Sequence, residues 1–256
     1  MRFIRQYFLL VSNVLKNGRI KGELLSAAKK LREDVDRLRF AAPVTHVYNP
    51  LAYAWAGHEL YLQKYAVGPK RIVFLGMNPG PFGMVQTGVP FGEISAVRDW
   101  LGIECAISKP KLEHPKRPVT GFACARSEVS GHRLWGLFAE RFGKPGDFFK
   151  QHIVLNYCPL AFVEETGRNR TPDKLPMPEQ QALFKVCDEH LQVAIEALKP
   201  EWVIGIGNFA AKRAEHVCNG PIELGCILHP SPASPAANRD WPSIARRQLQ
   251  ELGVWK

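Results

Sequence analysis

The chain has 256 residues, of which 46% are hydrophobic and 23% charged, a composition typical of a soluble globular protein with one sizeable core. Lysine and arginine outnumber aspartate and glutamate by 34 to 24, which favours a polyanionic partner such as nucleic acid or an anionic membrane surface, although the same excess could serve solubility alone. The six cysteines form no Cys-x-x-Cys pair, which argues against a zinc ribbon or an iron–sulfur site. We expect them to be small core residues in an intracellular, reducing compartment.

The first residues of the chain are basic and contain a short apolar run at positions 7–11. The run is too short to span a bilayer, and no small-residue cleavage site follows it, so we expect neither a transmembrane helix nor a signal peptide. We interpret residues 1–22 as a basic N-terminal arm or helix and residues 23–256 as a single domain. Apolar residues recur at helical spacing over residues 23–40, which predicts a surface helix.

Apolar runs alternate with helical patterns along the rest of the chain. The predicted strands are residues 71–75, 151–156, 201–206 and 222–228. The predicted helices are residues 51–65, 95–101, 130–142, 179–198, 208–217 and 240–252. This alternation predicts an α/β fold, namely a three-layer α/β/α arrangement around a central, mainly parallel four-stranded sheet.

A loop rich in glycine and proline, GMNPGPFGMVQTGVPFG, follows the first predicted strand at residues 76–92. Proline fixes φ and glycine permits positive φ, so the backbone follows an unusual path, and the loop is far longer than an ordinary connection. It carries Asn78, whose amide can donate and accept, and Phe91, which can stack on a flat ligand. At Gly80 and Gly83 a ligand could approach bare backbone. The pattern favours a ligand site over a plain strand-to-helix connection.

Polar residues follow three of the predicted strands directly. Asn78, Asn156 and His229 each lie just past the carboxyl end of a strand, where ligands bind in open parallel sheets, so we expect the three side chains to converge. A lone histidine is usually structural. Here His229 opens the proline-braced segment HPSPASPAANRDW, and this position favours a functional role. A further loop at residues 108–120 carries clustered cations suited to a phosphate backbone, or is simply solvated.

The segments at residues 76–92 and 229–241 together closely resemble the two signature motifs of the single-strand-selective monofunctional uracil-DNA glycosylases, in the uracil-DNA glycosylase superfamily. The likeness extends through YNPLAYAW, HPKRPV, SEVSG and NYCPL and covers roughly residues 23–254. The resemblance implies a DNA-repair enzyme that flips uracil, or a C5-modified uracil such as 5-hydroxymethyluracil, out of single- or double-stranded DNA. It would hydrolyse the N-glycosidic bond without a cofactor and leave an abasic site.

The resemblance also implies roles for individual residues. Asn78 would position the attacking water, and His229 would stabilise the negative charge that develops on the uracil O2. Phe91 would stack on the flipped base, and Asn156 would read its edge. Asn78 can orient water but cannot readily take its proton, and the motif has no aspartate beside Pro79, so strong general-base activation is not expected. No lysine nucleophile is evident, which favours water attack without strand scission.

Other family positions concern the base C5 and the DNA. Gly80 and Met84 would lie near the C5 atom of the base. The candidate DNA contacts are Pro230, Ser231, Pro232, Ala233, Ser234, Arg239, Lys116 and Arg117. The sequence departs from the family pattern at Ala233, where an arginine is expected at the tip of the wedge that enters DNA. Either Arg239 substitutes for this cation, or the enzyme invades duplex DNA poorly.

Several alternatives remain at the level of sequence. A phosphohydrolase would need a Gly-Lys-Ser/Thr loop or paired carboxylates for a metal, and the loop has neither. Ser231 lacks the Gly-x-Ser-x-Gly setting of a serine nucleophile. A non-enzymatic module that binds damaged bases and a glycosylase that prefers deaminated purines stay open. We expect no metal site and no membrane partner, a monomer, and a location with access to genomic DNA, either bacterial cytoplasm or a eukaryotic nucleus.

Overall fold

The computed structural model describes the backbone of residues 2–256 and the side chains of residues 17–256. The strands are β1 (Val44–Tyr48), β2 (Ile72–Gly76), β3 (His152–Asn156), β4 (Ala161–Glu164), β5 (Asn169–Arg170), β6 (Trp202–Ile206) and β7 (Glu223–Ile227). The α-helices are α1 (Arg2–Asp36), α2 (Pro50–Tyr53), α3 (Trp55–Tyr65), α4 (Met84–Thr87), α5 (Val129–Phe142), α6 (Pro145–Phe149), α7 (Met177–Leu198), α8 (Asn208–Val217) and α9 (Ala237–Glu251). Shorter turns are the π-helical η1 (Ala96–Trp100) and the 3₁₀-helical η2 (Gly121–Ala123) and η3 (Pro172–Lys174).

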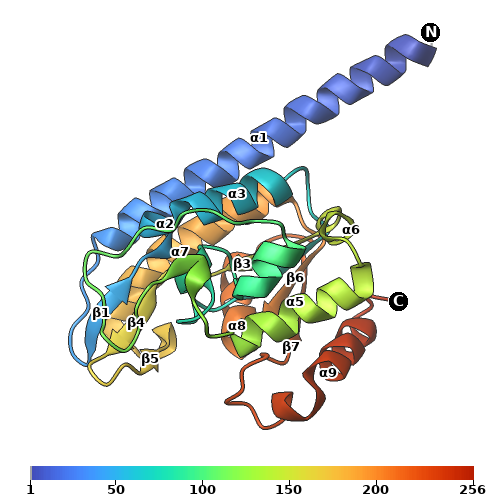
Figure 1. Ribbon diagram of the computed structural model, residues 1–256. Helices are drawn as coiled ribbons and strands as arrows, with labels where there is room; N and C mark the ends of the chain where they lie inside the picture. The colour runs from blue at the N-terminus through green and yellow to red at the C-terminus, as the bar shows by residue number, and fades with distance from the viewer. Residues whose placement is uncertain (1) are drawn as a thin grey trace.

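Four parallel strands form the central sheet in the order β3-β2-β6-β7. In the middle of the sheet Val73 pairs with Ile153 of β3 on one side and with Val203 of β6 on the other. Every residue of β2 is buried, as expected for a strand with helices over both faces. Figure 1 shows helices on both sides of this sheet. The predicted fold class is confirmed, and each predicted strand agrees with the structure to within one residue at either end.

Aromatic side chains join the helices to the sheet and to one another. Phe184 of α7 and Phe209 of α8 have ring centroids 5.7 Å apart. Phe138 of α5 packs against Phe74 of β2 with centroids 5.0 Å apart, and Trp255 near the C-terminus contacts Phe138 at 6.1 Å. Aromatic burial of this kind is a main source of core stability.

The N-terminal region differs from the prediction. We expected an arm or helix over residues 1–22 and a second helix over residues 23–40, whereas α1 is one helix from Arg2 to Asp36 whose first turns extend away from the body in Figure 1. Its buried face already begins before residue 23 and comprises Ile20, Leu24, Ala28, Leu31 and Val35. The side chains of the apolar run at residues 7–11 lie outside the described residues. Along the described chain, no helix combines the length and apolarity needed to cross a membrane.

A small antiparallel sheet, in the order β1-β4-β5, was not predicted. Its strands lie in segments for which the sequence predicted no strand. The predicted helix at residues 51–65 is divided into α2 and α3 at Ala54, and the one at residues 95–101 is a π-helical turn. β4 directly follows the loop after β3, so this sheet helps to place the rim of the site.

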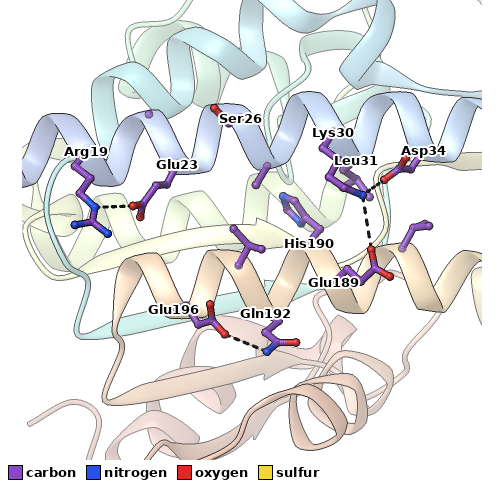
Figure 2. Close-up of a pocket in the computed structure, with 14 residues that line it drawn as sticks. Arg19, Glu23, Ser26, Lys30, Leu31, Asp34, Glu189, His190, Gln192 and Glu196 are labelled. Carbon is purple, nitrogen blue, oxygen red and sulfur yellow. Dashed lines mark hydrogen bonds and ion pairs between the residues drawn. The ribbon is translucent and has the colours of Figure 1, made fainter.

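Helices α1 and α7 face each other along a groove of about 850 Å³, shown in Figure 2. Lys30 of α1 reaches Glu189 of α7, with 3.7 Å between Nζ and Oε2. The ring of His190 lies between the two helices, where Leu31 also lines the groove. The groove shares no lining residue with the cavity at the strand ends described below.

Four buried or half-buried histidines should make the fold sensitive to acid. Burial lowers the pKa of four histidines from 6.5 to about 4, namely His58, His152, His190 and His229. Between these pH values the unfolded chain binds more protons than the folded chain. The free energy of unfolding should therefore fall by several kcal/mol as the pH drops from 6.5 towards 4, since each pKa unit is worth about 1.4 kcal/mol per group.

Urea unfolding at pH 7 and pH 5 measures this effect. The variant His190→Gln should lose less stability between the two pH values than the wild-type protein, while His132→Gln, at an exposed position of α5, should behave like the wild type. Equal stability of the wild-type protein at both pH values would contradict the prediction.

Candidate active site

A cavity of about 660 Å³ opens at the carboxyl ends of the central strands. The long loop after β2 supplies Asn78 and Phe91, the end of β3 supplies Asn156, and the segment after β7 supplies His229. The convergence expected from the strand order is therefore present in the structure. The remaining lining residues are Met77, Pro79, Gly80, Pro81, Phe82, Arg126, Ser127, Glu128, Val129, Ser130, Asn169, Thr171, Ser231, Pro232, Ala233 and Ser234.

The amide of Asn78 is held by the backbone of the neighbouring strand connection. Its Nδ2 donates a hydrogen bond to the carbonyl oxygen of Leu160 at 3.1 Å. This bond commits the nitrogen and leaves Oδ1 available to accept a hydrogen bond from a water molecule. Asn78 is thus placed to orient a water in the cavity without removing its proton.

His229 is a neutral hydrogen-bond donor at neutral pH. Burial lowers its pKa to about 4, so the imidazole carries no charge at pH 7. Its Nδ1 accepts a hydrogen bond from the backbone N–H of Ser231 at 3.1 Å. A neutral imidazole that accepts at Nδ1 carries its proton on Nε2. His229 therefore presents an N–H donor that needs no change of protonation to act.

Phe91 occupies a strained backbone position at the cavity wall. Its φ is 52°, in the left-handed region that non-glycine residues seldom adopt. The carbonyl oxygen of Phe91 accepts a hydrogen bond from the indole N–H of Trp135 at 3.1 Å, which helps to hold this conformation. The ring centroid lies 6.0 Å from that of His229. Strain of this kind is typical of functional sites, where the surroundings fix a side chain in place.

Asn156 presents an unsatisfied acceptor. Its Nδ2 donates to the sulfur of Met84 at 3.3 Å, while Oδ1 is enclosed and has no hydrogen-bond partner among the described residues. A Cβ on Gly76 would lie 2.6 Å from that oxygen and would also overlap the ring of Phe91, so only glycine fits there. Because buried polar atoms are nearly always paired, the oxygen points to a ligand that donates a hydrogen bond.

Two predicted base contacts occupy other positions than expected. Met84 is buried beneath Asn156 and does not line the cavity, and its sulfur accepts a hydrogen bond from the Asn156 amide. Gly80 lies at the cavity, but the space beside it and Gly83 is taken by the carboxyl group of Glu128. A side chain of the same chain, and not a ligand, thus approaches the bare backbone at these glycines.

The predicted DNA contacts are placed in two groups. Most of the segment after His229 lines the cavity, whereas Pro230 and Arg239 do not. Lys116 and Arg117 also lie outside the lining: Lys116 Nζ donates to the carbonyl of Thr166 at 3.3 Å and Arg117 Nε to that of Gly167 at 2.8 Å. These two cations are bonded to the loop between β4 and β5, and this loop leads to Asn169 at the cavity wall.

Sequence reasoning missed several residues that shape the cavity. Arg126 lies with its guanidinium carbon 3.9 Å from the ring centroid of Phe82. Arg133 of α5 donates to the carbonyl of Pro230 and to Oδ1 of Asn238, both at 3.0 Å, and so braces the proline-rich loop. Glu128 lies in the SEVSG motif, whose likeness to the family was noted without a role for this residue. Within the described residues, no cluster of three or more histidine, cysteine, aspartate or glutamate side chains could hold a metal ion.

Comparison with known proteins decides the family. The sequence model of the Uracil DNA glycosylase superfamily matches residues 63–252. The chain belongs to this superfamily. It is 47% identical over 228 residues to the single-strand selective monofunctional uracil-DNA glycosylase of Rattus norvegicus, covering 88% of this chain and 82% of the rat protein. The protein of the same description from Mus musculus is 46% identical over 228 residues, with the same coverage.

A solved structure shares the fold of this chain. The crystal structure of wild-type Pedobacter heparinus SMUG2 superposes with a TM-score of 0.65 at 17% sequence identity and covers 89% of this chain and 97% of that one. At this identity the likeness concerns the fold alone.

Proposed function

We propose that the protein is a monofunctional DNA glycosylase that hydrolyses the N-glycosidic bond of uracil, and of C5-modified uracil such as 5-hydroxymethyluracil. Its substrates are single- and double-stranded DNA, and its product is an abasic site for base excision repair. The observation that carries the proposal is a neutral histidine, with its proton on Nε2, in the same cavity as Asn78, Phe91 and Asn156.

The chemistry of the bond calls for such a donor. Breaking the bond places positive charge on the sugar and negative charge on the leaving uracil. The Nε2–H group of His229 stabilises the charge on the uracil O2, and because the donor is fixed before the reaction, it costs no reorganisation. The electron pair of the N-glycosidic bond leaves with the uracil. Water can then attack the sugar directly, so no protein group has to form a covalent intermediate.

Water completes the reaction at the anomeric carbon. Oδ1 of Asn78 orients that water, whose proton is lost to solvent after attack. No lysine is among the described residues that line the cavity, so no amine is placed to form a Schiff base with the sugar. The arrangement supports hydrolysis that leaves the DNA strand intact, as in a monofunctional glycosylase.

The flipped base would be held on its face and on its edge. Phe91 stacks on the ring, and Oδ1 of Asn156 accepts the hydrogen bond of N3–H, which satisfies the acceptor left open in the free protein. The amide nitrogen of Asn156 can exchange its weak bond to the Met84 sulfur for one to the base O4. Gly80 would lie near the base C5, with the carboxyl group of Glu128 beside it.

The proline-rich loop would enter the DNA where the base leaves. Ala233 is exposed at its tip, and its backbone N–H donates to Oγ of Ser231 at 3.1 Å. The cations Lys116, Arg117 and Arg239 would contact phosphates at the border of the site. We place the protein, as a monomer, in a reducing compartment with access to genomic DNA, which agrees with its six free cysteines.

The substitution Ala233→Arg should raise base release from matched duplex DNA roughly tenfold, because a larger wedge offsets part of the few kcal/mol that flipping costs in a duplex. Release from single-stranded DNA should stay within about twofold, since little unpairing is needed there. Rates on both substrates measure the effect. The control is Ala236→Arg, which adds the same charge at an exposed position beyond the tip. Unchanged release from duplex DNA would contradict the wedge role of this loop.

The proposed activity is tested with oligonucleotides that contain one uracil or one 5-hydroxymethyluracil, single- and double-stranded, in the presence of a metal chelator. We expect release of free base and an alkali-labile site. A module that only binds damaged bases would retain the oligonucleotide unchanged. Release confined to deaminated purines would instead support the alternative lesion preference.

A further inference from the structure

The carboxyl group of Glu128 occupies a socket formed by three glycines. A Cβ on Gly80 would overlap its Oε1, and one on Gly83 would overlap its Oε2. A Cβ on Gly131 would lie 2.9 Å from Oε2. Gly80 and Gly83 belong to the loop that carries Asn78, and Gly131 lies in the first turn of α5. The side chain thus joins this loop to the helix at a point where no other side chain fits.

This carboxyl group has no counter-ion among the described side chains, residues 17–256. Its Oε2 is enclosed and has no hydrogen-bond partner among the described residues, and Glu128 takes part in no ion pair there. Burial, together with the nearby carboxylate of Glu93, raises the pKa of Glu128 from 4.5 to about 7, and the backbone N–H of Gly131 offsets only part of this rise. A buried carboxylate without a partner is costly, so the neutral acid is the form that suits this socket.

The other charged and titratable groups around the socket are engaged elsewhere or are neutral. Glu93 accepts hydrogen bonds from Ser95 Oγ at 2.8 Å and from the N–H of Ala96 at 2.9 Å. Arg126 stacks on Phe82, Arg133 is bonded to the proline-rich loop, His132 is exposed on α5, and His229 on the cavity wall is neutral. None of these supplies a positive charge to Glu128.

We propose that Glu128 is a positioning residue whose neutral carboxyl group holds the Asn78 loop against α5, and that its ionisation disables the site. An ionised carboxylate here would repel Glu93 and strain the loop that places Asn78. It would also stand at the wall of the cavity in which the leaving base becomes negative, and so raise the energy of that charge. The inference rests on the proposed glycosylase function.

The test is the single-turnover rate of uracil release from single-stranded DNA as a function of pH. For the wild-type protein the rate should fall above about pH 7 and approach a tenfold loss per pH unit, as expected when one protonated group is required. The variant Glu128→Gln, which stays neutral at every pH, should keep a rate within about threefold of the wild type at pH 6 and lose this alkaline decline. Glu140→Gln, on the exposed part of α5, is the matched control and should keep the wild-type profile.

A second variant keeps Glu128 and changes only its neighbour. Glu93→Gln removes the like charge that raises the pKa of Glu128, so the alkaline decline should begin at lower pH than in the wild type. This shift tests the role of Glu128 ionisation even if Glu128→Gln does not fold. A purely structural role of Glu128 would leave the pH dependence of the rate unchanged in Glu93→Gln. A wild-type rate that does not vary above pH 7, or an alkaline decline that persists in Glu128→Gln, overturns the inference about Glu128 and leaves the proposed function standing. Absence of base release at every pH overturns the proposed function and this inference with it.

Discussion

Replacement of His229 by alanine should lower the single-turnover rate of uracil release by ~10² to 10³, the usual cost of removing one preorganised donor to a developing anion. The donor is the Nε2–H group, which the hydrogen bond from Ser231 to Nδ1 fixes in place. Because the interaction strengthens only as the bond breaks, the dissociation constant for uracil-containing DNA should change little. Quench-flow or manual-quench kinetics, with binding measured separately, give both quantities.

Two further variants sharpen this prediction. His229→Gln retains a neutral N–H donor and should be more active than His229→Ala, although less active than the wild type because its amide is less well placed. His132→Ala removes an exposed histidine of α5 and should leave the rate unchanged. Equal activity of His229→Ala and the wild-type protein would remove the histidine from the mechanism.

Replacement of Asn78 by alanine should lower the same rate by about 10², because loss of a positioned nucleophile or a displacement of about 1 Å typically costs that much. The amide holds its orientation through the bond to the Leu160 carbonyl, so the effect should appear in the rate and not in DNA affinity. The measurement is single-turnover release at saturating enzyme.

The matched control for this variant is Asn219→Ala. Asn219 is an exposed asparagine whose Nδ2 donates to the carbonyl of Val217 at the end of α8, and it does not line the cavity. The variant Asn219→Ala should release uracil at the wild-type rate. If Asn78→Ala weakened DNA binding as strongly as it slowed release, the residue would hold the substrate and not the water.

The sequence was a good guide to the central sheet because its signal is local. Each parallel strand is a short apolar run, and the run in β2 is buried along its whole length. Asn78, Asn156 and His229 could be brought together without coordinates because the carboxyl ends of parallel strands share one edge. The small sheet had no such signal, since β5 has only two residues and β1 is a five-residue strand, VTHVY, that is buried only at its two ends.

Contacts between distant segments could not be predicted in the same way. The glycine pattern at residues 80 and 83 indicated a close approach to bare backbone, but the group that approaches comes from Glu128, about fifty residues later in the chain. The brace from Arg133 to the proline-rich loop joins residues 97 positions apart. The burial of Met84 beneath Asn156 is likewise decided by packing, which a single sequence does not encode in any short pattern.

The most direct test of the account is mass spectrometry of a single-stranded oligonucleotide containing one uracil, incubated with the wild-type protein in the presence of a chelator. We expect free uracil together with a full-length strand that has lost the base and gained a hydroxyl at that sugar, and much less product with Asn78→Ala or His229→Ala. A strand that remains unchanged while bound to the protein, or one that is cut at the damaged site without added alkali, would contradict it.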